Sequence, residues 1–408
     1  MKHLKHILRG LTAVILLSLT TAVGAREAVK EQNPILKSMD SVQVSLLTCG
    51  PGQEVYSLYG HTAIRFHDIG RDQDLAINYG MFSFQQKNFI LRFVFGITDY
   101  EMAIQPFNLF IEEYRSDGRW VKEQTLNLSR EEKWAITQAI DENYRPENKV
   151  YRYNYFYDNC TTRARDMIVE HITGNVSYAE NRSYSPSYRS LIHDYTHGHP
   201  WMQLGNDLLL GVKADAKTNQ EEQQFLPVHL ENDFDNAIII NKDGSRRKLV
   251  AQSTYLLPPV ANHIDGGFPL SPIGCALVLA AFTIAICFIE AFTKKIFWGF
   301  DALWLLADGL CGLIILAMVF SQHPTVSLNF QILILCPLSI VFLIPVVRKL
   351  KKHQAHGYLN VLMAFLIIAL FLGIWQKYDV AMYILALILL IRIAIIKYWC
   401  KKPKLTNE

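Results

Sequence analysis

The sequence predicts two structural units joined end to end, an α+β domain followed by an all-α domain of five membrane-spanning helices. Residues 26–268 combine alternating strand patterns with capped helices and have the mixed composition of a soluble domain. From residue 269 to 398, long apolar stretches alternate with short polar loops, and residues 399–408 form a polar tail. Half of the 408 residues are hydrophobic and 19% are charged, which excludes a purely soluble protein and an intrinsically disordered one.

The charge balance excludes one class of partner. Forty Lys and Arg against 37 Asp and Glu leave a formal net charge of +3. A nucleic-acid-binding protein needs a basic face or stripe, which this balance does not provide. No nucleic-acid partner is therefore expected.

Residues 1–25 have the pattern of a cleaved signal peptide. A basic start with Lys2, Lys5 and Arg9 precedes an apolar core over residues 11–19, and Ala22-Val-Gly-Ala25 supplies the small residues of a cleavage site. An uncleaved membrane anchor is the alternative. No Cys follows the apolar core, so the chain is not expected to be a lipoprotein itself. The domain after residue 25 is expected in the periplasm of a bacterium.

The membrane-spanning stretches and their flanking charges predict an orientation. The five stretches long enough for a bilayer are residues 271–291, 300–320, 330–347, 359–375 and 380–396. With the first domain outside, the basic pairs Lys294–Lys295 and Lys351–Lys352 and the basic tail all fall inside, whereas the outside loops hold only Lys377. The sequence therefore predicts an inner-membrane protein with a cytoplasmic C-terminus.

Asp301 and Asp308 fall within the second of these stretches, and Arg392 falls within the last. Asp301 and Arg392 lie near the ends of their spans, so we expect them to extend toward the membrane surface. Asp308 lies nearer the middle, where a charge is costly. It is a candidate functional residue, with a hydrogen bond to a Ser, Thr or Trp of a neighbouring helix as the alternative.

The first half of the exported domain predicts a group of strands. Residues 41–47, 61–66 and 75–80 alternate or are rich in strand-forming residues, and residues 49–52 and 68–74 contain turn-forming Gly, Pro and Asp. A hairpin centred near Gly70 and Arg71 brings the residues around Asn78 and Gly80 opposite His61.

The second half predicts helices with recognisable starts. Ser129 followed by Glu132 is a capping box that opens a helix to about residue 144. Residues 150–157 read as a strand rich in tyrosine. Asp158-Asn159 then caps a helix from Cys160 to Ile172.

The predicted succession of strand, cap and helix places Cys160, a candidate nucleophile, at the start of a helix. The free N–H groups and the helix dipole at Cys160 favour a thiolate, and Arg163 and Arg165 add positive charge nearby. The same N–H groups can hold an oxyanion. His61 is the best-placed general base, and Asn78 can orient its imidazole.

Each of these assignments has a structural alternative. Cys160 can be a buried helix-start residue, or can form a disulfide with Cys49. His61 can be a hydrogen-bonded core histidine, and Asn78 can stabilise a turn or cap the end of a strand. The segment from His193 to His199 contains three imidazoles and makes a zinc site conceivable, but Gly198 and Pro200 interrupt a helix there and no His-Glu-x-x-His pattern is present. No metal or cofactor is expected.

Three segments resemble a known family. Leu47-Thr-Cys-Gly-Pro-Gly52, Tyr59-Gly-His-Thr-Ala-Ile64 and Tyr155-Phe-Tyr-Asp-Asn-Cys-Thr-Thr-Arg163 resemble the periplasmic domain of Lnb-type proteins of Bacteroidota. Members of that family are lipoprotein N-acyltransferases or are uncharacterised, and they also carry a C-terminal multi-span membrane domain. The order of His before Cys is similar to that of circularly permuted papain-like folds, including NlpC/P60-like hydrolases and lecithin-retinol acyltransferases.

The resemblance implies a fold and a reaction. It implies a circularly permuted papain-like domain with Cys160 as nucleophile, His61 as base and Asn78 as the polar third member. It further implies transfer of a fatty acyl chain from a phospholipid, through a Cys160 thioester, to the N-terminal amine of a lipoprotein. Two alternatives remain: a membrane-anchored cysteine hydrolase acting on cell-wall peptide or envelope protein, and a non-enzymatic envelope scaffold held by a Cys49–Cys160 disulfide.

Overall fold

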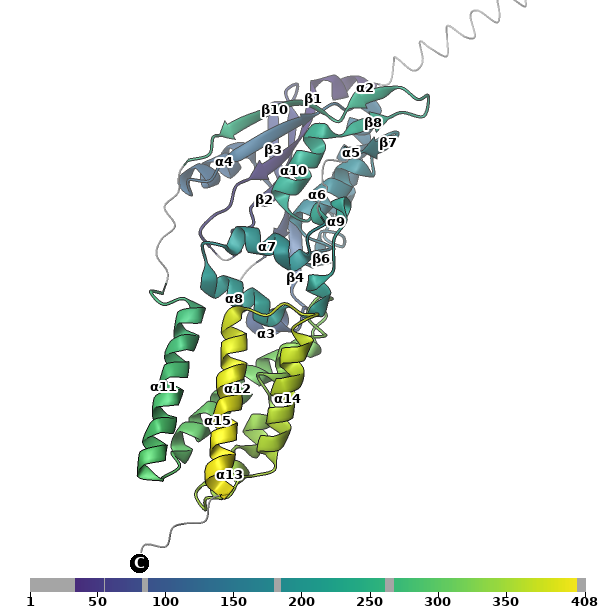
Figure 1. Cartoon of the computed structure of the whole chain (residues 1–408). Coiled ribbons are helices and arrows are strands. Elements are labelled where there is room, and N and C mark those ends of the chain that lie inside the picture. The colour runs from purple at the N-terminus through teal and green to yellow at the C-terminus, as the bar shows by residue number, and fades with distance from the viewer. Residues whose placement is uncertain (1–33, 55, 83–86, 180–184, 261–267, 402–408) are drawn as a thin grey trace, which may run out of the picture.

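The computed structural model describes residues 34–54, 56–82, 87–179, 185–260 and 268–401. The predicted signal peptide lies outside the described residues, as does the tail beyond residue 401. Figure 1 shows a sheet-containing domain at one end of the molecule and a bundle of long helices at the other.

The first domain is built on a seven-stranded antiparallel sheet with strand order β10-β5-β1-β2-β3-β4-β6. The strands are β1 (Val42–Cys49), β2 (His61–Asp68), β3 (Gln73–Met81), β4 (Asp99–Pro106), β5 (Val121–Leu126), β6 (Val150–Arg152) and β10 (Val250–Leu257). A small sheet pairs β7 (Asn175–Ser177), β8 (Ile238–Ile240) and β9 (Arg246–Lys248).

Helices cover both faces of the large sheet. The helical elements of this domain are α2 (Pro34–Ser38), η1 (Met39–Ser41), α3 (Phe89–Val94), α4 (Phe107–Ser116), α5 (Arg130–Asn143), α6 (Cys160–Val169), α7 (Tyr188–Thr196), α8 (Pro200–Leu209), η2 (Val212–Asp215), α9 (Gln220–Gln223) and α10 (Pro227–Asn236). The main core lies between the sheet and α5, α6 and α10, with Ile64, Ile136 and Phe234 fully buried in it. On the other face, Phe110 of α4 packs on a second cluster.

Most of the predicted elements of this domain are confirmed. The three predicted strands correspond to β1, β2 and β3, and the β2–β3 register pairs Ala63 with Asn78, which brings His61 level with Gly80. The capping box at Ser129 is formed, with its hydroxyl accepting from Glu132 N–H. The predicted strand over 150–157 is wrong beyond Arg152, because the Asn154 side chain accepts hydrogen bonds from the next amides and turns the chain.

The second domain contains α11 (Pro272–Thr293), α12 (Trp298–Val319), η3 (Phe330–Leu333), α13 (Leu338–Leu350), α14 (Tyr358–Leu372) and α15 (Val380–Lys401). Within the described residues, four helical stretches are long and apolar enough to cross a membrane: α11, α12, residues 330–350 and α15. The fifth predicted span, residues 359–375, corresponds to the 15-residue α14, which is apolar but shorter. The five-span count therefore stays a prediction.

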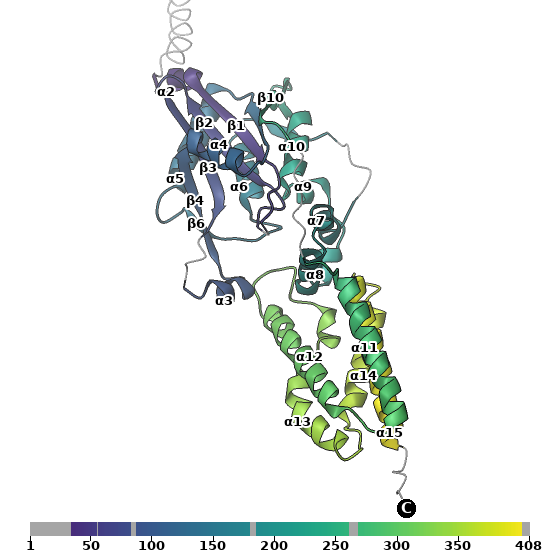
Figure 2. The same ribbon diagram turned by 90° about the vertical axis from the view of Figure 1, so that its left-hand side faces the viewer.

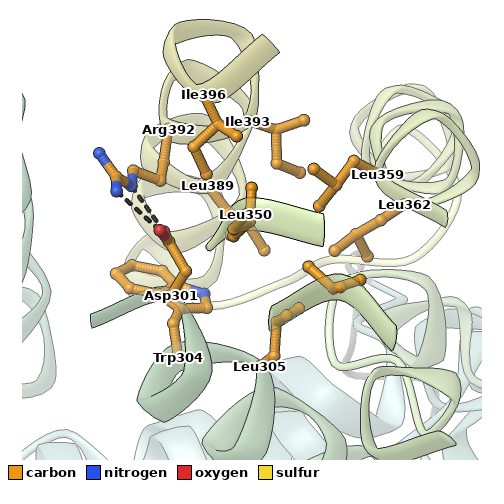
Figure 3. A pocket seen from close by; sticks show the side chains of 11 residues that line it. Asp301, Trp304, Leu305, Leu350, Leu359, Leu362, Leu389, Arg392, Ile393 and Ile396 are labelled. Carbon is orange, nitrogen blue, oxygen red and sulfur yellow. Dashed lines mark hydrogen bonds and ion pairs between the residues drawn. The ribbon is translucent and has the colours of Figure 1, made fainter. Parts of the chain in front are cut away.

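The expectation for Asp301 and Arg392 is wrong. Both side chains are buried, and the Arg392 guanidinium pairs with Asp301 at 2.7 Å and with Glu290 at 2.5 Å. Figure 3 shows the Arg392–Asp301 pair at one wall of a pocket whose other walls are mostly leucine and isoleucine. A charge in an apolar environment must be paired, and the ion pairs join α11, α12 and α15 instead of reaching the surface.

Asp308 makes the hydrogen bond to a neighbouring helix that was the alternative to a functional role. Its carboxylate accepts a hydrogen bond from the Ser339 hydroxyl and lies 3.3 Å from the Cys336 amide, just before α13 begins. Ser339 in turn lies 2.7 Å from the Tyr358 hydroxyl of α14. Asp308 thus satisfies the free amide at the break between η3 and α13, which explains an acidic residue at this depth without a functional role.

A buried polar network fixes the first domain on the second. The Arg189 guanidinium of α7 pairs with Asp207 at 2.8 Å and with Asp215 at 2.9 Å. From the membrane domain, Gln331 donates to the Asp207 carbonyl at 2.6 Å, and Gln376 donates to the Leu210 carbonyl at 3.1 Å. Buried groups of this kind tolerate little displacement, because a lost partner leaves an unsatisfied polar atom.

Candidate active site

Cys160 is the first residue of α6, and the residue before it caps the helix. Asn159 is buried, and its side-chain oxygen accepts hydrogen bonds of 2.9 Å from the amides of Thr161 and Thr162. Its side-chain nitrogen donates to the carbonyls of Tyr155 and Phe225. Asn159 therefore holds the helix start, and with it the sulfur of Cys160, against two loops.

His61 and Asn78 come from neighbouring strands. His61 opens β2, and its Nε2 lies 3.1 Å from Oδ1 of Asn78 on β3. An amide oxygen only accepts, so this contact places a proton on Nε2 and leaves Nδ1 of the neutral ring as a base. The three predicted residues are thus brought together, since His61 also contacts the Cys160 thiol.

The thiol and the imidazole alter each other's pKa. Burial alone raises the pKa of Cys160, but the charge of His61, its hydrogen bond, and hydrogen bonds from the Thr62 backbone and the Thr161 hydroxyl outweigh burial and lower it below its ordinary value. For His61, burial lowers the pKa, while the charge and hydrogen bond of Cys160 and the hydrogen bond of Asn78 raise it overall. The arrangement favours a thiolate–imidazolium pair, which is a ready nucleophile.

Two neighbours that were not predicted as site residues shape the space around the sulfur. Gly80 of β3 has a positive φ of 80°, and a Cβ there would lie 3.5 Å from the Cβ of Cys160 and 3.4 Å from the ring of Tyr153. The Thr62 hydroxyl lies 3.1 Å from that of Thr161, which ties β2 to α6 beside the site. The predicted hairpin register was the only signal for Gly80.

Fewer amides at the start of α6 are free to form an oxyanion hole than the sequence predicts. The Asn159 side chain occupies the amides of Thr161 and Thr162, so these are not available to a ligand. Within the described residues, the amide of Cys160 itself is the first-turn donor that has no partner. This amide is the group that can stabilise negative charge on a carbonyl oxygen attacked by the sulfur.

Arg163 and Arg165, which were expected to place positive charge near Cys160, are paired with carboxylates instead. Arg163 pairs with Asp158 at 2.6 Å and stacks on the ring of Tyr151 at 3.5 Å. Arg165 pairs with Asp166 at 2.7 Å. The charge that lowers the pKa of Cys160 is instead that of His61.

Cys49 does not form the alternative disulfide. Both Cys49 and Cys160 are free thiols, and Cys49 is fully buried at the end of β1. Burial raises the pKa of the Cys49 thiol to about 12, so it is a neutral and unreactive group at neutral pH.

The histidine segment is not arranged as a metal site. His193 Nε2 lies 2.9 Å from the buried Asp207 carboxylate, as part of the network at the domain junction. His197 and His199 flank the break between α7 and α8. Among the described residues, no group of three or more His, Cys, Asp or Glu side chains is placed to hold a metal ion.

Aromatic and apolar side chains connect the site to the membrane domain. The ring of Tyr155 packs on that of Tyr59 at 5.0 Å, and both border a cluster that also contains Met318 and Val326 of the membrane domain. Burial raises the pKa of Tyr59 to about 12, so its hydroxyl stays neutral. The loop that precedes Cys160 thus borders an apolar cluster that continues to the outer end of α12.

Replacing the helix cap tests how firmly Cys160 is held. Asn159→Ala removes two accepted and two donated hydrogen bonds, and we expect it to destabilise the protein by about 2 kcal/mol. The measurement is the unfolding temperature of the full chain in detergent, which should fall by several degrees. Asn236→Ala, which removes an exposed asparagine at the end of α10, is the control. Equal unfolding temperatures for the two variants would contradict the assignment.

Comparison with protein families agrees with this division of the chain. Residues 35–194 match the Lnb N-terminal periplasmic domain, and residues 263–404 match the Lnb transmembrane domain. No curated protein and no solved structure matches the chain, so the circularly permuted papain-like description stays a prediction. The chain belongs to the Lnb family, and is a lipoprotein N-acyltransferase-like membrane protein with a periplasmic domain.

Proposed function

We propose that the protein transfers a fatty acyl chain from a membrane phospholipid to the N-terminal amine of a lipoprotein, with Cys160 as the covalent carrier. The observation that carries the proposal is the contact of the Cys160 thiol with His61, whose Nε2 is held by Asn78. A low-pKa thiol at a helix start, beside a base that is itself oriented, is the arrangement of an acyl-transferring cysteine enzyme.

The first step moves the acyl group to sulfur. The Cys160 thiolate attacks the ester carbonyl of the phospholipid, and the amide of Cys160 stabilises the oxyanion. The bond between the acyl carbon and the glycerol oxygen then breaks, and the imidazolium of His61 gives its proton to that oxygen. The products are a lysophospholipid and an acyl thioester on Cys160.

The second step moves the acyl group to nitrogen. The neutral α-amine of the lipoprotein's N-terminal cysteine attacks the thioester carbonyl, and His61 accepts the proton released from nitrogen. The carbon–sulfur bond breaks, which yields an amide and restores the thiolate–imidazolium pair. Asn78 keeps the imidazole in one orientation through both proton transfers.

The junction between the two domains supports a lipid substrate. The ion pairs of Arg189 and the hydrogen bonds of Gln331 and Gln376 hold the catalytic domain at a fixed position above the helices. Phospholipid and lipoprotein are both confined to the membrane, so a tethered site meets them at a raised effective concentration. A cysteine hydrolase acting on freely diffusing peptides gains nothing from this arrangement.

The orientation predicted from charge fits the same function. The basic residues Lys294 and Lys351 lie at the ends of α11 and α13, and Figure 1 shows these ends on the side of the bundle away from the sheet domain. Basic residues favour the cytoplasmic side, which leaves the candidate site in the periplasm and the C-terminus in the cytoplasm.

Trapping the acyl-enzyme tests the reaction. Full-length protein incubated with phospholipid and no acceptor should gain the mass of one fatty acyl group on Cys160, and neutral hydroxylamine, which cleaves thioesters, should remove it. The expected result is an adduct on the peptide containing Cys160 and on no other cysteine peptide. Cleavage of cell-wall peptide without any lipid adduct would replace the proposal by the hydrolase. If the protein shows neither an acyl adduct nor peptide cleavage, the non-enzymatic scaffold would be favoured.

A further inference from the structure

The short helix α3 lies at the outer end of the membrane domain. It connects β3 to β4, and the loop after α12 is bonded to it: the Gln322 amide donates to the Phe95 carbonyl at 2.9 Å, and His323 Nε2 lies 3.1 Å from the Phe93 carbonyl. Figure 2 shows α3 beside the outer end of α12. Since α12 is long and apolar enough to cross the membrane and ends at Val319, α3 lies where that helix leaves the hydrocarbon region.

The exposed side of α3 is apolar. Leu91 is 59% exposed and Phe93 is 46% exposed. The charged residue between them, Arg92, pairs with Asp99 at 2.6 Å and so faces back to the sheet. Leucine and phenylalanine exposed at this depth match the lipid-facing side of an interfacial helix.

Behind this helix, a row of aromatic rings runs to the candidate nucleophile. Ring centroids lie 6.3 Å apart for Phe93 and Phe89, 5.7 Å for Phe89 and Phe82, 5.1 Å for Phe82 and Tyr100, and 4.3 Å for Tyr100 and Tyr153. Tyr153 and Cys160 are both within 3.5 Å of the position that a Cβ on Gly80 would occupy. The row therefore begins at the exposed side of α3 and ends beside the sulfur.

We propose that α3 lies in the outer interface of the membrane and that this row of rings guides one acyl chain of a phospholipid from the bilayer to Cys160. An acyl chain that leaves the bilayer loses favourable free energy with every methylene exposed to water, so it needs an apolar path. The row of rings provides an apolar surface for this path, and the row starts at α3, at the depth of the membrane interface. The membrane contact of α3 does not depend on the function proposed above, whereas the guiding role does.

Photo-crosslinking tests the membrane contact. A benzophenone amino acid replaces Leu91 in the full chain, reconstituted in vesicles of phosphatidylethanolamine and phosphatidylglycerol. Leu109 of α4 is the matched control, because it is equally exposed (60%) but follows the end of β4 that lies opposite the site. We expect phospholipid adducts at position 91 to exceed those at position 109 by about tenfold or more. Equal yields would overturn the contact, and this result does not depend on any enzymatic activity.

Two variants test the guiding role. Leu91→Asp should raise the KM for vesicle phospholipid by about tenfold or more with little change in kcat, whereas Leu109→Asp should change neither. Phe89→Ala, which removes a ring from the row, should slow transfer from long-chain phospholipid but not from a water-soluble butyryl thioester. The rate of Cys160 alkylation should stay at the wild-type value in all three variants, which shows that the site is folded.

The outcomes separate the two proposals. Unchanged use of long-chain phospholipid by Leu91→Asp and Phe89→Ala would overturn the guiding role while leaving acyl transfer intact. Wild-type protein that forms no acyl-enzyme would overturn the proposed function and the guiding role together. The adducts at position 91 would still decide whether α3 contacts lipid.

Discussion

Cys160→Ser is expected to lower lipoprotein N-acylation by about a thousandfold or more. Serine has nearly the same size, so Asn159 still caps α6 and the contacts of Thr161 and Thr62 remain. The hydroxyl ionises far less readily than a thiol, so the ion pair with His61 is lost and both steps lose their nucleophile or leaving group. The measurement is the intact mass of a reporter lipoprotein made in cells whose only acyltransferase is the variant.

Two other thiols provide the controls. Cys311→Ser changes an exposed thiol on α12, and Cys49→Ala removes the buried thiol at the end of β1, whose pKa burial raises to about 12. Both variants should give a fully N-acylated reporter. If the reporter from the Cys160→Ser variant carries a normal N-acyl group, the sulfur at this position is not the carrier and the proposed mechanism is wrong.

The part of the site that sequence could predict is the part set by local patterns. The Asp68–Asp74 turn centres the β2–β3 hairpin, and the period of two then determines which residues of β3 lie beside His61. An asparagine before Cys160 predicts the start of α6, and the side chain does cap it. These rules act over a few residues, so a single sequence contains them in full.

What sequence could not predict depends on residues distant in the chain. Glu290, Asp301 and Arg392 each look out of place in their own span, and only the packing of three helices shows that they pair. Of the helix-start amides that we expected to hold an oxyanion, those of Thr161 and Thr162 are occupied by the cap itself. Tyr153 belongs to an alternating, strand-like run, but the Asn154 side chain accepts hydrogen bonds from the amides of Phe156 and Tyr157, which ends the strand-like run just after Tyr153.

His61→Ala is expected to affect both proton transfer and the ionisation of the nucleophile. Loss of a general acid and base typically lowers a rate by about a hundredfold to ten-thousandfold. Without the charge and hydrogen bond of His61, burial becomes the main effect on Cys160, so the pKa of the thiol should rise from below its ordinary value of 9.0 to above it. The thiolate fraction at neutral pH should therefore fall.

The pH dependence of Cys160 alkylation measures this shift directly and needs no substrate. In the wild type, the rate should reach half its maximum below pH 9.0, because the pKa of Cys160 is lowered, and in His61→Ala the curve should move to higher pH. Asn78→Ala should move it in the same direction by less, since the hydrogen bond of Asn78 is one of several causes that raise the pKa of His61. A half-maximum in His61→Ala that stays at the wild-type pH would mean that another group stabilises the thiolate, and the pairing of residues 61 and 160 would lose its chemical role.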